Sequence, residues 1–245
     1  NTAFGPETTL RATGIIKTGD VEIGVDVGDL ASFDASNETY SLIGNPYQAQ
    51  VNLEDLLTNH SSGLNPNFAY IYDPNITDNG GYAIVDLSNP INITVDPTSS
   101  DANELLQSNQ AFFVETIASN PSLTFTESTK TTNTSNLNTF SDDDLSTNQF
   151  ITFNLYDDDE QDLKDGVRLK FSNNYSNQVN HSDAPKLWNN FEWFAIVNDA
   201  DYLAIESRAI PQQNDTINLY TGNYQSTNYH FEINVHEMDY AEVQL

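Results

Sequence analysis

The chain has 245 residues and a mass of 27.3 kDa, enough for one large domain or two small ones with a buried core. Eight Lys and Arg oppose 36 Asp and Glu, and the formal net charge of −28 excludes nucleic acid and anionic membranes as partners, because both require a basic face. The absence of cysteine excludes disulfides, thiol nucleophiles and cysteine-ligated zinc. We also expect no membrane insertion, since no apolar run approaches the ~18 residues that cross a bilayer.

Short apolar or alternating runs, separated by Gly, Pro, Asn and Asp, predict β-strands along most of the chain. In chain order the expected strands are 21–27, 40–43, 68–72, 82–85, 111–115, 122–126, 150–155, 167–171, 194–197, 202–205, 216–219 and 229–236. After the second strand, Gly-Asn-Pro-Tyr at 44–47 predicts a turn, because proline fixes φ and lacks an N–H donor. Asn52 is then expected to cap a helix over 53–59, and weaker helical patterns fall at 102–107 and 185–189.

Many short strands without a strand–helix–strand rhythm predict an all-β fold of antiparallel β-sandwich type, jelly-roll or immunoglobulin-like. Residues 129–148 contain few core-forming side chains and are expected to form a linker or long connection. This divides the chain into a first β-sandwich domain at 1–128 and a second at 149–245. We therefore expect two packed or tandem sandwiches with one or two short helices.

Several segments occur in an order similar to that of a known family. These are the segments at 12–25, at 42–57 with its Gly-Asn-Pro-Tyr turn, at 70–85, at 105–116, at 122–128 and at 151–171. They resemble a β-sandwich region of large surface proteins exported by the type IX secretion system of Bacteroidota, upstream of the C-terminal sorting domain. The sequence departs from the family's pattern at Ala111, where the family usually has glycine, and at 107–109.

The resemblance implies an extracellular, non-catalytic region of a secreted bacterial cell-surface protein. Its partners would be other domains of the same protein or neighbouring subunits. The acidic composition agrees with this location, because a salty or divalent-rich exterior screens the self-repulsion of such a surface. The chain begins at Asn1 rather than Met, so we expect a processed product or a piece of a larger protein.

A cluster of carboxylates between two expected strands is the sharpest local motif. Its candidate calcium ligands are Asp157, Asp159, Asp162 and Asp165. Calcium takes six to eight oxygen ligands and would relieve the repulsion between such carboxylates, although the spacing differs from that of an EF-hand loop. A solvated hairpin tip explains the same cluster, and we favour it over the calcium site.

Trp188 and Trp193 form a second candidate site, a platform on which sugar rings could stack. With Phe191 and Phe194 nearby, we favour the alternative that these side chains belong to the core. His230 and His236 share a strand face but lie about 20 Å apart along it, too far for one zinc ion.

No nucleophile elbow, zinc-protease motif or P-loop occurs, and no pair among the 36 carboxylates stands out, so we expect no enzyme. The sequence favours a role in adhesion or as a structural or filament component. The alternative is a carbohydrate-binding accessory module of a secreted hydrolase. An exposed aromatic patch at Trp188 and Trp193 would distinguish the two.

Overall fold

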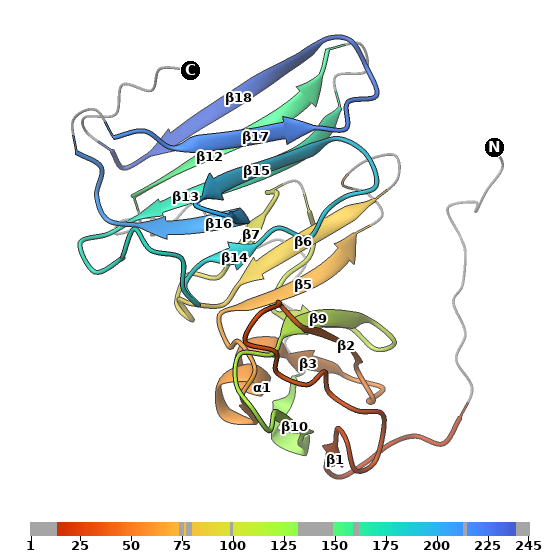
Figure 1. Ribbon diagram of the computed structural model, residues 1–245. Coiled ribbons are helices and arrows are strands. Elements are labelled where there is room, and N and C mark those ends of the chain that lie inside the picture. Colours follow the sequence, from red (N-terminus) through yellow and green to blue (C-terminus); the bar gives the residue numbers. More distant parts are fainter. Residues whose placement is uncertain are drawn as a thin grey trace, which may run out of the picture.

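The computed structural model of the protein describes residues 14–73, 76, 80–98, 100–131, 149–158, 162–212 and 215–238. Figure 1 shows strands arranged in two stacked parts, which we call the N-terminal half (14–131) and the C-terminal half (149–238). The predicted all-β sandwich fold is confirmed, and no ladder joins a described strand of one half to one of the other. No helix in the described part of the chain is long and apolar enough to cross a membrane.

The N-terminal half contains a five-stranded antiparallel sheet with the order β2-β9-β5-β6-β7. Its strands are β2 (Tyr40–Gly44), β9 (Ala111–Glu115), β5 (Phe68–Asp73), β6 (Gly81–Asp86) and β7 (Thr94–Asp96). Two small sheets have the orders β1-β10-β4 and β11-β3-β8. Their strands are β1 (Val21–Glu22), β10 (Ser122–Phe125), β4 (Ser61–Ser62), β11 (Lys130–Thr131), β3 (Gln50–Asn52) and β8 (Leu105–Leu106), and a 3₁₀ turn, Glu127–Thr129, precedes β11.

The helix α1 (Leu53–Asn59) has its predicted bounds. Asn52 caps it, because its side chain accepts a hydrogen bond from the N–H of Asp55 at 3.1 Å. The three leucines of α1 are fully buried and face the core of the N-terminal half. A helix of seven residues is too short to be stable alone, so this packing holds it in place.

The predicted turn at Gly-Asn-Pro-Tyr, before α1, is confirmed, and the side chain of Asn45 holds it in place by hydrogen bonds. The Asn45 Nδ2 lies 2.8–3.1 Å from three backbone oxygens, those of Ala49, Leu106 and Gln107. Tyr47 is buried, and its hydroxyl donates to the carbonyls of Gly19 (2.8 Å) and Phe125 (2.9 Å). The turn therefore connects segments that are distant in sequence.

The five-stranded sheet is covered on both faces. On β5, Ala69 and Ile71 face α1 and β10 within the core of the N-terminal half. Phe68 and Tyr70 point the other way and pack with residues of the C-terminal half, including Ala184. Because alternate residues of β5 are apolar on both faces, this strand lies between two cores.

The C-terminal half is one seven-stranded sheet with the order β17-β15-β16-β13-β12-β18, in which β14 also pairs with β16. The strands are β12 (Gln149–Asp157), β13 (Leu163–Phe171), β14 (Ala184–Pro185), β15 (Trp193–Asn198), β16 (Asp201–Arg208), β17 (Asn218–Gly222) and β18 (Tyr229–His236). The sheet curls over its own apolar face, so the rings of Phe194 on β15 and Phe231 on β18 lie 5.2 Å apart. The ladder between β13 and β16 is parallel, an exception to the antiparallel prediction.

Three local predictions were wrong. The strand expected at 21–27 ends at Glu22, because Gly24 has a φ of 89° and the chain turns there. The helix expected at 102–107 is instead a loop leading into β8, which pairs with β3. The helix expected at 185–189 is also absent, since Pro185 belongs to β14 and the following N–H, of Lys186, donates to Tyr202 O on β16.

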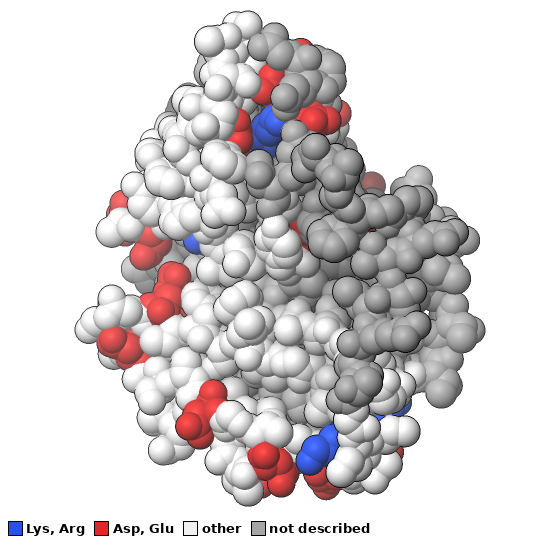
Figure 2. Space-filling view, turned by 90° about the vertical axis from the view of Figure 1, so that its right-hand side faces the viewer, with Lys and Arg blue, Asp and Glu red and all other residues white. Residues whose placement is uncertain are grey.

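Basic side chains are concentrated inside the C-terminal half. Five of the eight Lys and Arg lie between residues 164 and 208, and each has a largely buried side chain. The face of the molecule in Figure 2 accordingly shows carboxylates spread over it and basic atoms in only a few places. Eight acidic residues are buried as well, among them the partners of these cations, so the exterior of the described part of the chain keeps an excess of carboxylates and few cations.

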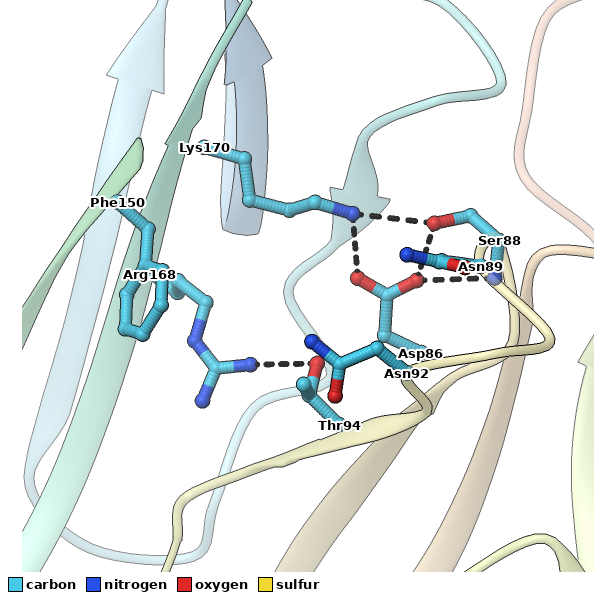
Figure 3. A pocket seen from close by; sticks show the side chains of 8 residues that line it. All are labelled: Asp86, Ser88, Asn89, Asn92, Thr94, Phe150, Arg168 and Lys170. Carbon is cyan, nitrogen blue, oxygen red and sulfur yellow. Dashed lines mark hydrogen bonds and ion pairs between the residues drawn. The ribbon is translucent and has the colours of Figure 1, made fainter. Parts of the chain in front are cut away.

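Two of these cations connect the halves. Lys170 of β13 lies 2.6 Å from a carboxylate oxygen of Asp86 on β6, as Figure 3 shows, and it also donates to Ser88 Oγ at 3.1 Å. Arg168, two residues earlier on the same face of β13, donates to Thr94 Oγ1 and lies 3.6 Å from the buried carboxylate of Asp96. The junction between the halves thus combines an apolar cluster with buried ion pairs.

A small cavity of about 20 Å³ adjoins these groups. Its lining residues are Asp86, Ser88, Asn89, Asn92, Thr94, Phe150, Arg168 and Lys170. The Nε atom of Arg168 is buried and has no hydrogen-bond partner among the described residues. A cavity of this size has room for about one water molecule and is too small for an organic ligand.

Removing one partner of the junction should destabilise the whole protein. Lys170→Met leaves the Asp86 carboxylate buried without its cation, and we expect a loss of about 3–5 kcal/mol in the free energy of unfolding, measured by urea denaturation. Lys17→Met is the control, because it removes the same charge at an exposed position and should change the stability little. Equal losses for the two variants would contradict a stabilising role for the junction.

Candidate functional site

The outer face of the C-terminal sheet carries a group of aromatic side chains on β15, β16 and β17. Successive residues of a strand point to opposite faces, so Phe194 enters the core while Trp193 and Ala195 point outward. Tyr220 on β17 is the register partner of Ala195, and Tyr202 on β16 is the partner of Val197. Because register partners share a face, these aromatic residues emerge together on the outer face of the sheet.

Trp188, in the segment between β14 and β15, completes the group. Its ring centroid lies 5.3 Å from that of Trp193, 5.2 Å from that of Tyr202 and 6.0 Å from that of Tyr220. We call these four residues the aromatic surface. Trp188 is 38% exposed and Tyr202 is 41% exposed, and none of the four belongs to a buried apolar cluster among the described residues.

Small residues and hydrogen bonds fix the aromatic rings. Ala195 is completely buried, although it points to the outer face of the sheet, where Tyr220 is its neighbour. A Cβ atom at Gly222 would lie only 2.8 Å from the Tyr220 hydroxyl, so the tyrosine crosses this position closely. The indole N–H of Trp193 donates to Asn189 O at 2.9 Å. The rings are therefore held in place before any ligand arrives.

The prediction that Trp188 and Trp193 belong to the core was wrong. Trp193 and Phe194 are adjacent on a strand, so only one of them can face the core, and it is Phe194. The contributions of Tyr202 and Tyr220 were missed. Each tyrosine is next to a leucine that packs in the core, Leu203 beside Tyr202 and Leu219 beside Tyr220. Because successive strand residues point to opposite faces, this pattern could have predicted that both tyrosines face outward.

The rings are tilted against one another by 51–79° and their centroids are only 5.2–6.0 Å apart. At this spacing they fill the space between themselves, as edge-to-face aromatic pairs do. A ligand therefore cannot enter between them as in an aromatic cage for ammonium groups. It has to lie across the exposed faces and edges of Trp188 and Tyr202.

The four candidate calcium ligands do not all come together. Asp165 is buried, and one of its oxygens lies 2.5 Å from Lys186 Nζ, while the other accepts the N–H of Phe194 at 2.9 Å. Asp157 is buried and accepts a short hydrogen bond from Ser226, whereas Asp162 is exposed. Asp159 lies outside the described residues, so calcium binding at this loop stays a prediction.

Within the described residues, no three His, Asp or Glu side chains converge on a point where a metal ion could bind. The two histidines of β18 are used separately. The His230 ring stacks on Tyr156 and its Nδ1 contacts Asp158 at 2.5 Å, and the His236 ring stacks on Phe150 with 4.1 Å between centroids. The expectation that they do not share a zinc ion agrees with this geometry.

One glutamate near the junction of the halves has a strongly shifted pKa. Most of the surface of Glu38 is exposed, but its carboxyl is partly buried, and this burial raises its pKa to about 7. The negative charges of Glu115 and Asp201 add to the shift. Asp201 begins β16 beside Tyr202. Glu38, Glu115 and Asp201 thus form a local concentration of negative charge to which both halves contribute.

No family model, curated protein or solved structure matches this chain. We therefore infer the function from the aromatic surface and the charge of the molecule.

The pKa of Glu38 predicts a pH dependence of stability. Between its ordinary value of 4.5 and about 7 the folded state binds more protons than the unfolded state. The contribution of this group to stability is therefore largest at low pH and is lost as the pH rises through this window. Glu38→Gln should thus gain melting temperature relative to wild type on going from about pH 4 to about pH 8.

Thermal unfolding of both proteins across this pH range measures the difference. Glu22→Gln removes the same charge from an exposed position on β1 and controls for net charge. A constant difference between Glu38→Gln and wild type at all pH values would show that this carboxyl ionises alike in the folded and unfolded chains.

Proposed function

We propose that the protein is a non-catalytic glycan-binding module, and that it serves adhesion as part of a secreted bacterial cell-surface protein. The observation that carries the proposal is the exposure of Trp188 beside Trp193, Tyr202 and Tyr220 on one face of a rigid sheet. Sugar rings present flat faces of C–H groups, which pack on aromatic rings, while their hydroxyl groups remain in water. An open aromatic surface of this kind suits a polymer or a chain end better than a small ligand that needs enclosure.

The position of the site on strands also supports binding. Aromatic side chains supply large contact areas at low cost in conformational entropy, and they are enriched where proteins bind partners. Here the rings are already fixed by Ala195, Gly222 and the Asn189 carbonyl, so little order has to be gained on binding. Preorganisation of this kind distinguishes the surface from scattered exposed aromatic residues.

Charge narrows the class of glycan. The net charge is −28, and the carboxylate of Asp201 lies next to Tyr202 in the chain. Uronic-acid and sulfated polymers would be repelled by this field, particularly at low ionic strength. We therefore propose a neutral or amino-sugar polymer as the ligand.

The extracellular location rests on the resemblance to type IX-exported proteins and on the anionic exterior. A module with an open aromatic surface would hold the parent protein on a polysaccharide outside the cell. The same chemistry would serve an accessory module of a secreted hydrolase, so the binding step is common to both versions of the proposal.

The chain offers a direct measurement, because its two tryptophans both belong to the aromatic surface. Titration with cellohexaose, laminarihexaose and chitosan oligomers should change the tryptophan emission and give a Kd, whereas polygalacturonate should not bind. Trp188→Ala should weaken binding at least about tenfold, the equivalent of 1.4 kcal/mol. Tyr202→Ala should weaken it in the same direction while tryptophan emission remains available as the readout.

Phe33→Ala is the matched control, since Phe33 is similarly exposed (41%) and belongs to the N-terminal half. This variant should bind like wild type. If no neutral or amino-sugar polymer in a broad glycan panel binds wild-type protein, or if Trp188→Ala binds as tightly as wild type, the proposal is wrong.

A further inference from the structure

Among the described strands, none pairs with one of the two edges of β18. Over its whole length it pairs with β12, from Phe150 opposite His236 to Asp157 opposite Tyr229, and no other described strand pairs with it. In Figure 1 it forms the upper margin of the molecule. Backbone groups of successive residues in an antiparallel strand point alternately to its two sides. Every second residue of this eight-residue strand therefore offers its N–H and C=O to the free edge, which is a template for pairing with another strand.

Other sheet ends are shorter or occupied. In the five-stranded sheet, the end strand β2 is approached by the segment at Ala31, whose N–H donates to Ser41 Oγ at 2.8 Å, and β7 lies against β13 through the Arg168 contacts. The end strand β17 has five residues. The edge of β18 is therefore the longest one left open among the described strands.

Apolar side chains remain uncovered along this edge. The odd-numbered residues of β18 face the interior of the curled sheet, where Ile233 is opposite Phe153. Phe231 and Val235 are nevertheless 38% and 40% exposed, although their partners on β12 are buried. A further strand beside β18 would cover them and extend the apolar layer.

The edge also lacks the features that usually prevent such pairing. Its sequence, Tyr-His-Phe-Glu-Ile-Asn-Val-His, contains no lysine, arginine or proline. Its one carboxylate, on Glu232, accepts hydrogen bonds from Asn154 (3.2 Å) and Tyr156 (3.4 Å) on β12. Nothing on this strand repels an identical strand at close range except that carboxylate.

We propose that β18 pairs antiparallel with β18 of a second copy, about a two-fold axis at Ile233. In this register Phe231 lies beside Val235 of the second copy and Ile233 lies beside its own equivalent. Glu232 lies beside Asn234 of the second copy. A register shifted to centre on Glu232 would instead place two carboxylates side by side, which is destabilising.

The pairing is self-complementary and therefore closes as a dimer, so it does not continue into a filament. It places two aromatic surfaces on one particle. Long-range repulsion between two copies that each carry −28 charges opposes it. The dimer should therefore be weak in dilute buffer and stronger when salt shortens the Debye length, from about 30 Å at 0.01 M to about 3 Å at 1 M.

Sedimentation equilibrium at low and high salt tests the association. We expect a salt-dependent dimer, and Val235→Lys should raise its dissociation constant at least about tenfold by placing a charge in the paired edge. Val25→Lys adds the same charge at an exposed site in the N-terminal half and should leave it unchanged. Unfolding curves for both variants check that each is folded. A wild-type monomer at high salt and high concentration, or a dimer insensitive to Val235→Lys, overturns the proposal.

Cross-linking tests the register, because the chain contains no cysteine of its own. Directly opposed residues in an antiparallel pair have Cα atoms about 4.5–5.5 Å apart, within reach of a disulfide. Ile233→Cys should therefore form a disulfide-linked dimer under mild oxidation much faster than Glu232→Cys or the surface control Val25→Cys. Equal rates for all three, or a faster rate for Glu232→Cys, overturn this register.

Discussion

Two buried cations on one face of β13 hold the molecule together as a unit. Arg168 and Lys170 leave the C-terminal sheet toward Asp96 and Asp86, and each side chain would be costly to bury without its partner. Such pairs stabilise a protein little more than apolar side chains in the same place would. They do disfavour other alignments of the two halves, because a sheet displaced by one residue would bury four unpaired charges. The apolar cluster around Tyr70 supplies the contact area of this junction, and the ion pairs fix its alignment.

The two halves differ in how much of their sheet surface is left open to a partner. The N-terminal half uses both faces of its main sheet for packing, so little of that sheet is free to bind a partner. The C-terminal half curls around its own core, and the outer face of β15–β17 and the edge of β18 are left open. The aromatic surface and the free edge thus belong to the same half, while the other half acts as its support.

Features set by neighbouring residues could be predicted from the sequence, and those set by distant contacts could not. The helix after Asn52 and the turn before it follow from capping and proline chemistry, which act within a few residues. The patterns at 102–107 and 185–189 look helical locally, but strands far along the chain pair with those segments. The position of Trp193 depended on which face of β15 is covered, and sequence pattern alone did not decide that. The partners of Arg168 and Lys170 lie more than 70 residues away and left no local pattern.

The burial of the basic side chains has a consequence for resistance to proteolysis. Trypsin-like proteases cut after lysine and arginine, and they require an extended, accessible chain at that residue. Among the described residues only Lys17 is a fully exposed basic residue, whereas the five between 164 and 208 lie in the folded interior of the C-terminal half. The arrangement that fixes the junction therefore also removes five of the seven described basic residues from the surface that such a protease can reach.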